Sequence, residues 1–184
     1  NSPGNPTGKV LGVDHLRKVV AWARERGVIV ASDECYLGLG WDDDHEPVSI
    51  LDPRVCDGDH TGLIAIHSLS KSSNLASYRG GYLAGDPALI AELLGVRKHA
   101  GLMVPGPIQA AMVAALTDDD QEQAQKLRYA HRRAALLRAL IGAGFTVDDS
   151  EAGLYLWATR GEHCRATVDA LAELGILVAP GDFY

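Results

Sequence analysis

The sequence predicts an α/β fold in which a parallel or mixed sheet is covered by helices on both faces. Three observations support this: a length of 184 residues, a composition of 47% apolar and 22% charged residues, and short apolar runs that alternate with helical patterns. The length corresponds to one domain or slightly more. This much apolar surface can offset chain entropy, which excludes a disordered tail.

The first half of the chain alternates helix and strand signals. Apolar residues recur at helical spacing from Leu16 to Ala23, after Asp14, a favourable N-cap, and before Gly27, which is typical of a helix end. Short apolar runs are expected to be strands. They span residues 28–31, 63–66 and 80–85.

The second half begins with helical patterns over residues 88–100 and 107–116, which Pro105 and Pro107 separate. A long helix follows Asp118, where negative charge favours a helix N-terminus. Its apolar stripe is expected to face the core, with Arg132 and Arg133 in solvent. The stripe consists of Leu127, Ala130, Ala134, Leu137 and Ile141.

A smaller α+β unit is expected after the long helix. Its predicted strands cover residues 145–147, 154–157 and 176–179, and its predicted helix covers residues 167–174. We place a domain boundary inside the long helix, which gives a larger unit over residues 1–125 and a smaller one over residues 126–184.

Charge and cysteine content narrow the function classes. Lys and Arg number 17 and Asp and Glu number 24, so the net charge is −7, which disfavours nucleic acid and anionic membranes as partners. No apolar run approaches the ~20 residues that span a bilayer. Three widely spaced cysteines without CxxC spacing predict neither disulfides nor a metal site. We therefore expect a cytoplasmic protein with reduced thiols.

Both ends of the sequence have the character of loops. The chain opens on NSPGNPTG without an initiator Met and closes on APGDFY. We therefore expect the chain to be part of a larger protein, truncated at both ends.

Polar residues follow the expected strands, at the edge where open α/β sheets bind ligands. Asp33 follows one apolar run and Lys71 follows another. A lysine in this position is compatible with a solvated surface, with a phosphate loop, or with an amine that attacks a carbonyl. The absence of GxxxxGK[ST] argues against a Walker-type nucleotide site.

Four motifs carry a resemblance to a known family. They are Asn5-Pro6-Thr7-Gly8, Asp33-x-x-Tyr36, Ser68-x-Ser70-Lys71 and Arg79. Their order and approximate spacing resemble the fold-type I pyridoxal-phosphate (PLP) aminotransferases of the aspartate aminotransferase-like class. The resemblance covers the whole chain, as the later part of the large domain and part of the small domain. The segments SDECYLGLGW, HSLSKSS, AGLYLWATRGE and ILVAPGDFY resemble bacterial N-succinyldiaminopimelate aminotransferases.

The resemblance implies pyridoxal 5'-phosphate as the cofactor and assigns roles toward it. Lys71 would attach the cofactor aldehyde and move a proton between the substrate carbon and the cofactor. Asp33 would pair with the pyridine nitrogen and keep it protonated. Asn5 and Tyr36 would hydrogen-bond the phenolic oxygen of the cofactor. Ser68 and Arg79 would bind its phosphate, with help from Ser70.

The resemblance also implies an activity: transfer of an amino group between glutamate and a keto acid, with the succinylated keto precursor of diaminopimelate as the favoured acceptor. Family members are homodimers. Their phosphate loop, ring-stacking aromatic residue and carboxylate-binding arginine would lie outside residues 1–184, so the chain alone is not expected to catalyse the reaction.

Other interpretations remain open. A carbon–sulfur β-lyase of the same fold would use Lys71, Asp33 and Tyr36 in the same way, and a transcription regulator can carry a non-catalytic aminotransferase-like domain. Asp33 could instead serve as a helix cap. His67 is expected to be a packed or capping histidine rather than a general base.

Overall fold

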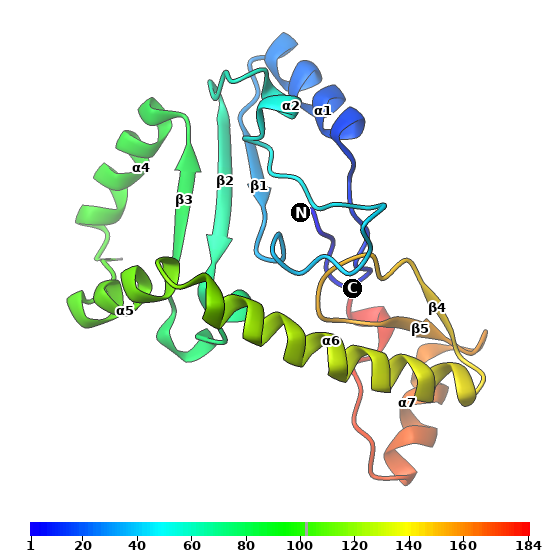
Figure 1. Cartoon of the computed structure of the whole chain (residues 1–184). Coiled ribbons are helices and arrows are strands. Elements are labelled where there is room, and N and C mark those ends of the chain that lie inside the picture. The colour runs from blue at the N-terminus through cyan, green and yellow to red at the C-terminus, as the bar shows by residue number, and fades with distance from the viewer. Residues whose placement is uncertain (102) are drawn as a thin grey trace.

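A computed structural model describes residues 1–101 and 103–184 and shows an α/β fold built on a three-stranded mixed sheet (Figure 1). The strands are β1 (Val30–Asp33), β2 (Leu63–Ser68) and β3 (Gly81–Gly85). β1 pairs with β2 in parallel, and β2 pairs with β3 antiparallel. The predicted mixed sheet is therefore confirmed, with β2 in its centre.

β1 begins two residues later than the apolar run predicted. Val28 and Ile29 are 45% and 55% exposed. The reason is a helix-terminating bond, because the Val28 N–H donates to the Ala23 carbonyl at 2.9 Å and is not available to the sheet. Pairing starts at Val30, whose N–H donates to the Gly62 carbonyl at 2.9 Å.

The core lies between the sheet and the helix α1 (Val13–Glu25), with the short helix α2 (Pro53–Cys56) beside it. Gly12 is the N-cap of α1, so the expected cap Asp14 lies instead in the first turn. The core is formed by apolar residues of these helices, of β2 and of the loop before α2. They are Leu16, Val20, Val48, Ile50, Val55, Cys56, Leu63 and Ala65.

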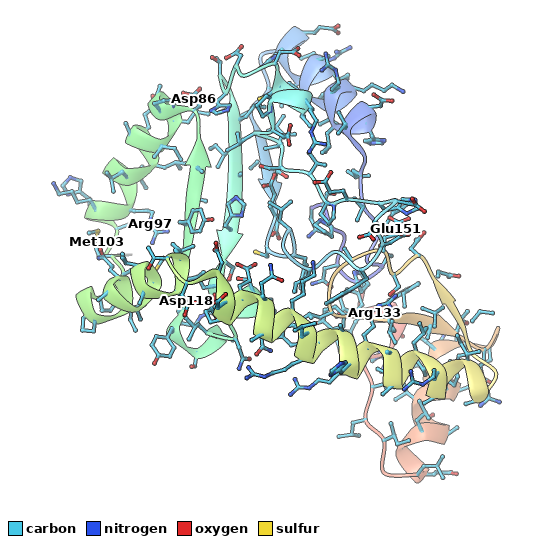
Figure 2. All side chains as sticks on the ribbon, viewed as in Figure 1. Asp86, Arg97, Met103, Asp118, Arg133 and Glu151 are labelled. Carbon is cyan, nitrogen blue, oxygen red and sulfur yellow. The ribbon has the colours of Figure 1, made fainter. Side chains whose placement is uncertain are left out.

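Four helical elements of the described chain lie between the end of β2 and residue 117; the last two agree with the predicted ranges 88–100 and 107–116, and the first two are not among the predictions. The four elements are α3 (Leu69–Ser72), the 3₁₀ turn η1 (Ala76–Tyr78), α4 (Pro87–His99) and α5 (Gly106–Leu116). Asp86, labelled in Figure 2, caps α4 by accepting from the Ala88 N–H at 2.8 Å, and also accepts from the Gly62 N–H at 2.8 Å. One carboxylate thus ties the start of α4 to the start of β2.

α6 (Asp119–Gly142) is the long helix that crosses from the sheet to the C-terminal elements, and it runs unbroken through residue 125 (Figure 1). Asp118 caps it by accepting from the Gln121 N–H at 3.2 Å. The prediction of its buried face is correct only in part. Ala130, Ala134 and Leu137 are partly buried, but Leu127 and Ile141 are 62% and 60% exposed, and the polar Gln125 is buried. The segments that face α6 present polar atoms, which select polar partners on the helix.

The C-terminal elements are a two-stranded antiparallel sheet, the helix α7 (Cys164–Glu173) and the 3₁₀ turn η2 (Gly181–Phe183). The sheet pairs β4 (Thr146–Asp148) with β5 (Trp157–Thr159), so the second strand lies later than predicted. The strand predicted over residues 176–179 does not form, and Leu177 is 90% exposed. No strand among the described residues runs beside this segment, so its backbone has no ladder to join.

Several apolar side chains of α4 and α5 lie on the surface of the chain. Leu94, Val96 and Val113 are all exposed, and neither helix contains a buried residue. Across residues 1–101 and 103–184, no helix has the length and apolar character required to cross a membrane.

The core predicts a clear effect of cavity formation. Leu63→Ala in β2 should lower the free energy of unfolding by roughly 2–5 kcal/mol, because Leu63 is buried between the sheet and α1. Leu177→Ala at an exposed position is the control and should stay within about 0.5 kcal/mol. Urea unfolding of the complete polypeptide that contains these residues measures both. Equal effects of the two variants would contradict the described core.

Candidate active site

One cavity of about 470 Å³ gathers every residue to which the motifs assign a role. Its lining includes Asn5, Asp33, Tyr36, Ser68, Ser70, Lys71 and Arg79. The cavity lies where β1 and β2 end, so the sheet edge brings together motifs that are separated by as many as 74 positions in the sequence. Cys35, Ala76 and Asn1 complete its wall.

Asp33 is the last residue of β1, and the turn that follows the strand orients it. The Cys35 N–H donates to Asp33 Oδ1 at 3.1 Å, and the Ser2 N–H donates to the Asp33 carbonyl at 3.2 Å. The second carboxylate oxygen remains available to a cationic group in the cavity. The interpretation of Asp33 as a helix cap is not supported, since no helix starts at this residue.

Ser68 and Lys71 belong to the turn that follows β2. The Ser68 side chain is the N-cap of α3, because its Oγ accepts from the Ser70 N–H at 3.1 Å. A hydroxyl that accepts in this way keeps its proton to donate to an anion. Lys71 lies one turn further on, and its carbonyl accepts from the Tyr129 hydroxyl at 3.2 Å.

Arg79 reaches the cavity from the turn between η1 and β3. Its backbone is left-handed, with φ of 56°, which turns the chain sharply into the antiparallel strand. One guanidinium nitrogen donates to the Ala76 carbonyl at 3.0 Å. The other N–H groups of the fork can still bind an anion in the cavity.

Asn5 and Tyr36 form another part of the cavity wall. Asn5 lies in a turn closed by the Gly8 N–H, which donates to the Gly4 carbonyl at 2.8 Å. Tyr36 is buried, and burial is the main cause that raises the pKa of its phenol to about 12. At neutral pH Tyr36 is therefore a hydrogen-bond donor and not a phenolate.

Cys35 lines the same cavity, but its thiol is expected to be unreactive. Burial, and then the hydrogen bond to Asp33, raise the pKa of its thiol to about 12, while the positive charge of Lys71 acts in the opposite direction. A thiol with this pKa stays protonated at neutral pH, so Cys35 is not a nucleophile here.

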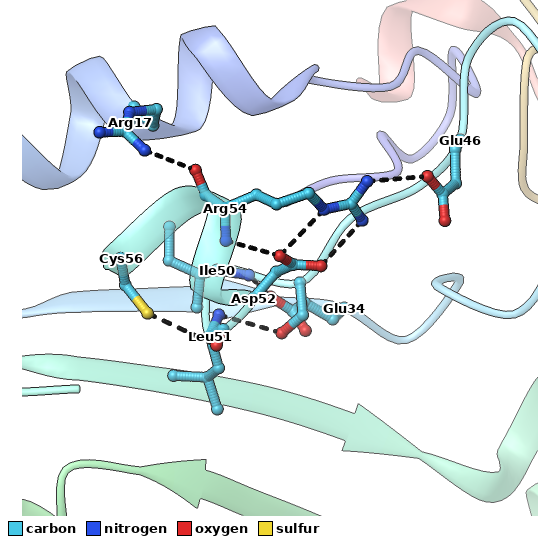
Figure 3. Close-up of polar contacts among 9 residues, drawn as sticks. Arg17, Glu34, Glu46, Ile50, Leu51, Asp52, Arg54 and Cys56 are labelled. Carbon is cyan, nitrogen blue, oxygen red and sulfur yellow. Dashed lines mark hydrogen bonds and ion pairs between the residues drawn. The ribbon is translucent and has the colours of Figure 1, made fainter. Parts of the chain in front are cut away.

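Glu34 and His67 form a buried pair that sequence reasoning missed in part. Glu34 Oε1 accepts from the Ile50 N–H at 2.7 Å, as Figure 3 shows, and Glu34 Oε2 has no hydrogen-bond partner. His67 Nε2 lies 3.5 Å from that oxygen, and the His67 ring stacks on Tyr82 at 4.9 Å. His67 is thus a packed residue, as expected. Strand alternation places Glu34 and His67 on the face opposite Asp33 and Ser68, which is the signal that could have identified the pair.

The donors and acceptors of the cavity match the groups of PLP. Arg79, Ser68 and Ser70 offer donors for a phosphate, Asp33 offers a carboxylate for a pyridinium, and Lys71 offers an amine for an aldehyde. Asn5 and Tyr36 offer donors for a phenolic oxygen.

Fold and cavity together define a class of protein: a fold-type I PLP transferase, in which a sheet edge carries the lysine and the carboxylate. The model of the family "Aminotransferase class I and II" matches residues 1–184, so the chain belongs to this family, whose members depend on PLP.

Individual relatives agree with this assignment. The chain is 73% identical to a probable aminotransferase of Mycobacterium tuberculosis and 62% identical to the 4-dedimethylamino-4-oxo-anhydrotetracycline transaminase OxyQ of Streptomyces rimosus, over 100% of its own length. It covers 44% and 51% of those two proteins, which is about half their length. The structure of N-succinyldiaminopimelate aminotransferase from Mycobacterium tuberculosis is similar with a TM-score of 0.83 and 28% identity, over 94% of this chain and 45% of that one.

The raised pKa of Cys35 predicts slow alkylation. A rise from 9.0 to about 12 reduces the thiolate fraction at pH 8 by roughly a thousandfold, so iodoacetamide should modify Cys35 about a thousand times more slowly in the folded protein than in urea. Peptide mass spectrometry over a time course measures the rate at this residue. Equal rates in the folded and unfolded protein would contradict the described environment.

Proposed function

We propose that residues 1–184 form the lysine-bearing part of a PLP-dependent aminotransferase that moves an amino group between glutamate and a keto compound. The observation that carries the proposal is the single cavity lined by Lys71, Asp33, Arg79 and their neighbours. Family membership over the whole chain supports it.

Each residue has a chemical task in this proposal. When bound, PLP supplies an electron sink for the substrate carbon that loses its proton. Lys71 would hold the cofactor at its aldehyde, and its amine would move a proton at the reacting carbon of the substrate. Asp33 keeps the ring nitrogen protonated, because a nearby carboxylate favours the cationic form.

The other residues of the cavity bind and orient the cofactor. Tyr36 donates to the phenolic oxygen, which its raised pKa permits at neutral pH, and Asn5 assists. Ser68, Ser70 and Arg79 bind the phosphate as donors. We further propose that the complete protein is a homodimer.

For the acceptor, the proposal is the succinylated keto precursor of diaminopimelate. Its support is the structural similarity to the Mycobacterium tuberculosis N-succinyldiaminopimelate aminotransferase. A second acceptor class has support of its own, because the 62% identical Streptomyces rimosus relative is named for a ring ketone, a 4-oxo-anhydrotetracycline. A carbon–sulfur β-lyase or a regulatory domain has no such relative among those described above.

The role of Lys71 predicts covalent labelling. The complete protein loaded with PLP should retain the cofactor after borohydride reduction, and Lys71→Ala should lose the label and roughly 10²- to 10⁴-fold of its activity. Asp33→Asn should keep the label and lose roughly 10- to 1000-fold of its activity, since about 1–3 pKa units of pyridinium stabilisation disappear. Mass spectrometry of tryptic peptides locates the label. An equal label on Lys71→Ala would refute the assignment.

The reaction class and acceptor predict a product pattern. With glutamate as donor, 2-oxoglutarate should form only when an acceptor is present, and the succinylated keto precursor should support the largest kcat/KM. A higher kcat/KM with a fused-ring ketone would contradict this acceptor and favour the second acceptor class instead. Release of pyruvate and ammonia from cystathionine, without glutamate turnover, would instead identify a β-lyase.

A further inference from the structure

One face of α6 carries polar side chains at intervals of four residues. The row consists of Gln121, Gln125, Tyr129 and Arg133. Residues four apart lie on the same side of a helix, and this side faces the rest of the chain, since Gln125 is buried and the other three are partly buried. The inward side of α6 therefore carries this polar row in addition to three partly buried residues of the predicted stripe, Ala130, Ala134 and Leu137.

Two residues of this row, Gln121 and Tyr129, hold the turn that carries Lys71. The Tyr129 hydroxyl donates to the Lys71 carbonyl at 3.2 Å, and Gln121 Nε2 donates to Ser73 Oγ at 2.9 Å. α3 is only four residues long, so it contributes little stability of its own. Contacts from a longer element are needed to fix its orientation.

The C-terminal end of the row holds a different segment. Arg133 donates to the Ser150 carbonyl at 2.9 Å and to Ser150 Oγ at 3.0 Å. Figure 2 shows Arg133 on α6, beside the segment that leads from β4 toward Glu151. Ser150 is buried and has a left-handed backbone, with φ of 66°, so the two bonds hold a strained turn. Burial lowers the pKa of the Arg133 guanidinium, which bonds here to neutral oxygens.

The Ser150 segment in turn supports two other parts of the cavity wall. The Ser150 N–H donates to the Thr7 carbonyl at 3.1 Å, and the Ala152 N–H donates to the Gly8 carbonyl at 2.9 Å. These bonds fix the turn that contains Asn5. The Gly153 N–H donates to the Leu39 carbonyl at 2.9 Å, in the loop that contains Tyr36.

We propose that Tyr129 and Arg133 are positioning residues that hold the Lys71 turn and the Asn5 turn in a fixed relation by anchoring both to one helix. Four residues of α-helix correspond to a rise of about 6 Å, so the two anchors lie one turn apart on a stiff rod. A movement of α6 shifts both turns together and preserves the cavity. The effect of these two residues on catalysis rests on the proposed function, whereas their role in holding the two turns rests on the hydrogen bonds alone.

Hydrogen exchange of the complete protein without cofactor tests the structural part. Tyr129→Phe removes one hydroxyl and should speed exchange of the Ser73–Leu75 amides about fivefold. Arg133→Met should speed exchange of the Ser150 and Ala152 amides roughly tenfold or more, because bonds to a charged donor are lost. Arg132→Met, at the exposed neighbouring position, is the matched control and should change neither segment. Unchanged exchange in the target segments, or equal acceleration in the control, overturns the proposal.

Kinetics of the loaded protein test the catalytic part. In Tyr129→Phe, kcat should fall about fivefold while KM for glutamate stays within about twofold, because misplacing Lys71 affects the transition state more than substrate binding. Arg133→Lys, which keeps one charged donor nitrogen, should recover part of the kcat that Arg133→Met loses. Altered exchange with unaltered kcat refutes the positioning role. A wild-type protein without transaminase activity but with the expected exchange pattern refutes the proposed function alone.

Discussion

Parallel pairing of β1 with β2 is the constraint on which the geometry of the cavity depends. Asp33 lies opposite Ile66, and the Glu34 N–H donates to the Ile66 carbonyl at 2.9 Å. Since side chains alternate along a strand, this register places Asp33 and Ser68 on the same face, with Lys71 in the turn just beyond. A slip of one residue would move Asp33 to the other face. The distance between the carboxylate and the lysine is therefore set by strand pairing.

Packing on the opposite face makes such a slip unfavourable. His67 of β2 lies opposite Tyr82 of β3, and Glu34, the residue directly after β1, is fully buried with its carboxyl group 3.5 Å from His67. Its carboxylate binds the Ile50 N–H and faces His67. A buried carboxyl group that loses its hydrogen bond is costly, so the contact with Ile50 favours one register. Packing on the sheet face away from the cavity thus stabilises the strand register that places Asp33 and Ser68 on the cavity face.

The sequence was most informative where a local pattern of residues also determines the position of a side chain in the fold. Asp33 and Lys71 could be found because each follows an apolar run that forms a strand, and residues at the ends of such strands lie at the ligand-binding edge of an α/β sheet. The start of β1 could not be predicted, because it depends on whether the Val28 N–H closes α1 or joins the sheet. The expected strand over residues 176–179 failed for a related reason, since strand propensity without a neighbouring strand does not make a sheet.

α6 shows why periodicity alone could not identify its buried face. An apolar stripe and a polar row both follow the helical repeat, so the choice between them depends on the surface opposite. On that surface, three carbonyl oxygens accept from the polar row, namely those of Lys71, Ala115 and Ser150. Lys71 and Ala115 lie at the C-terminal ends of α3 and α5, and Ser150 lies in a left-handed turn. Carbonyls at such positions have lone pairs that can accept further hydrogen bonds, which polar side chains supply and apolar ones cannot. The polar face of α6 thus matches the acceptors of the segments that carry Lys71 and Ser150.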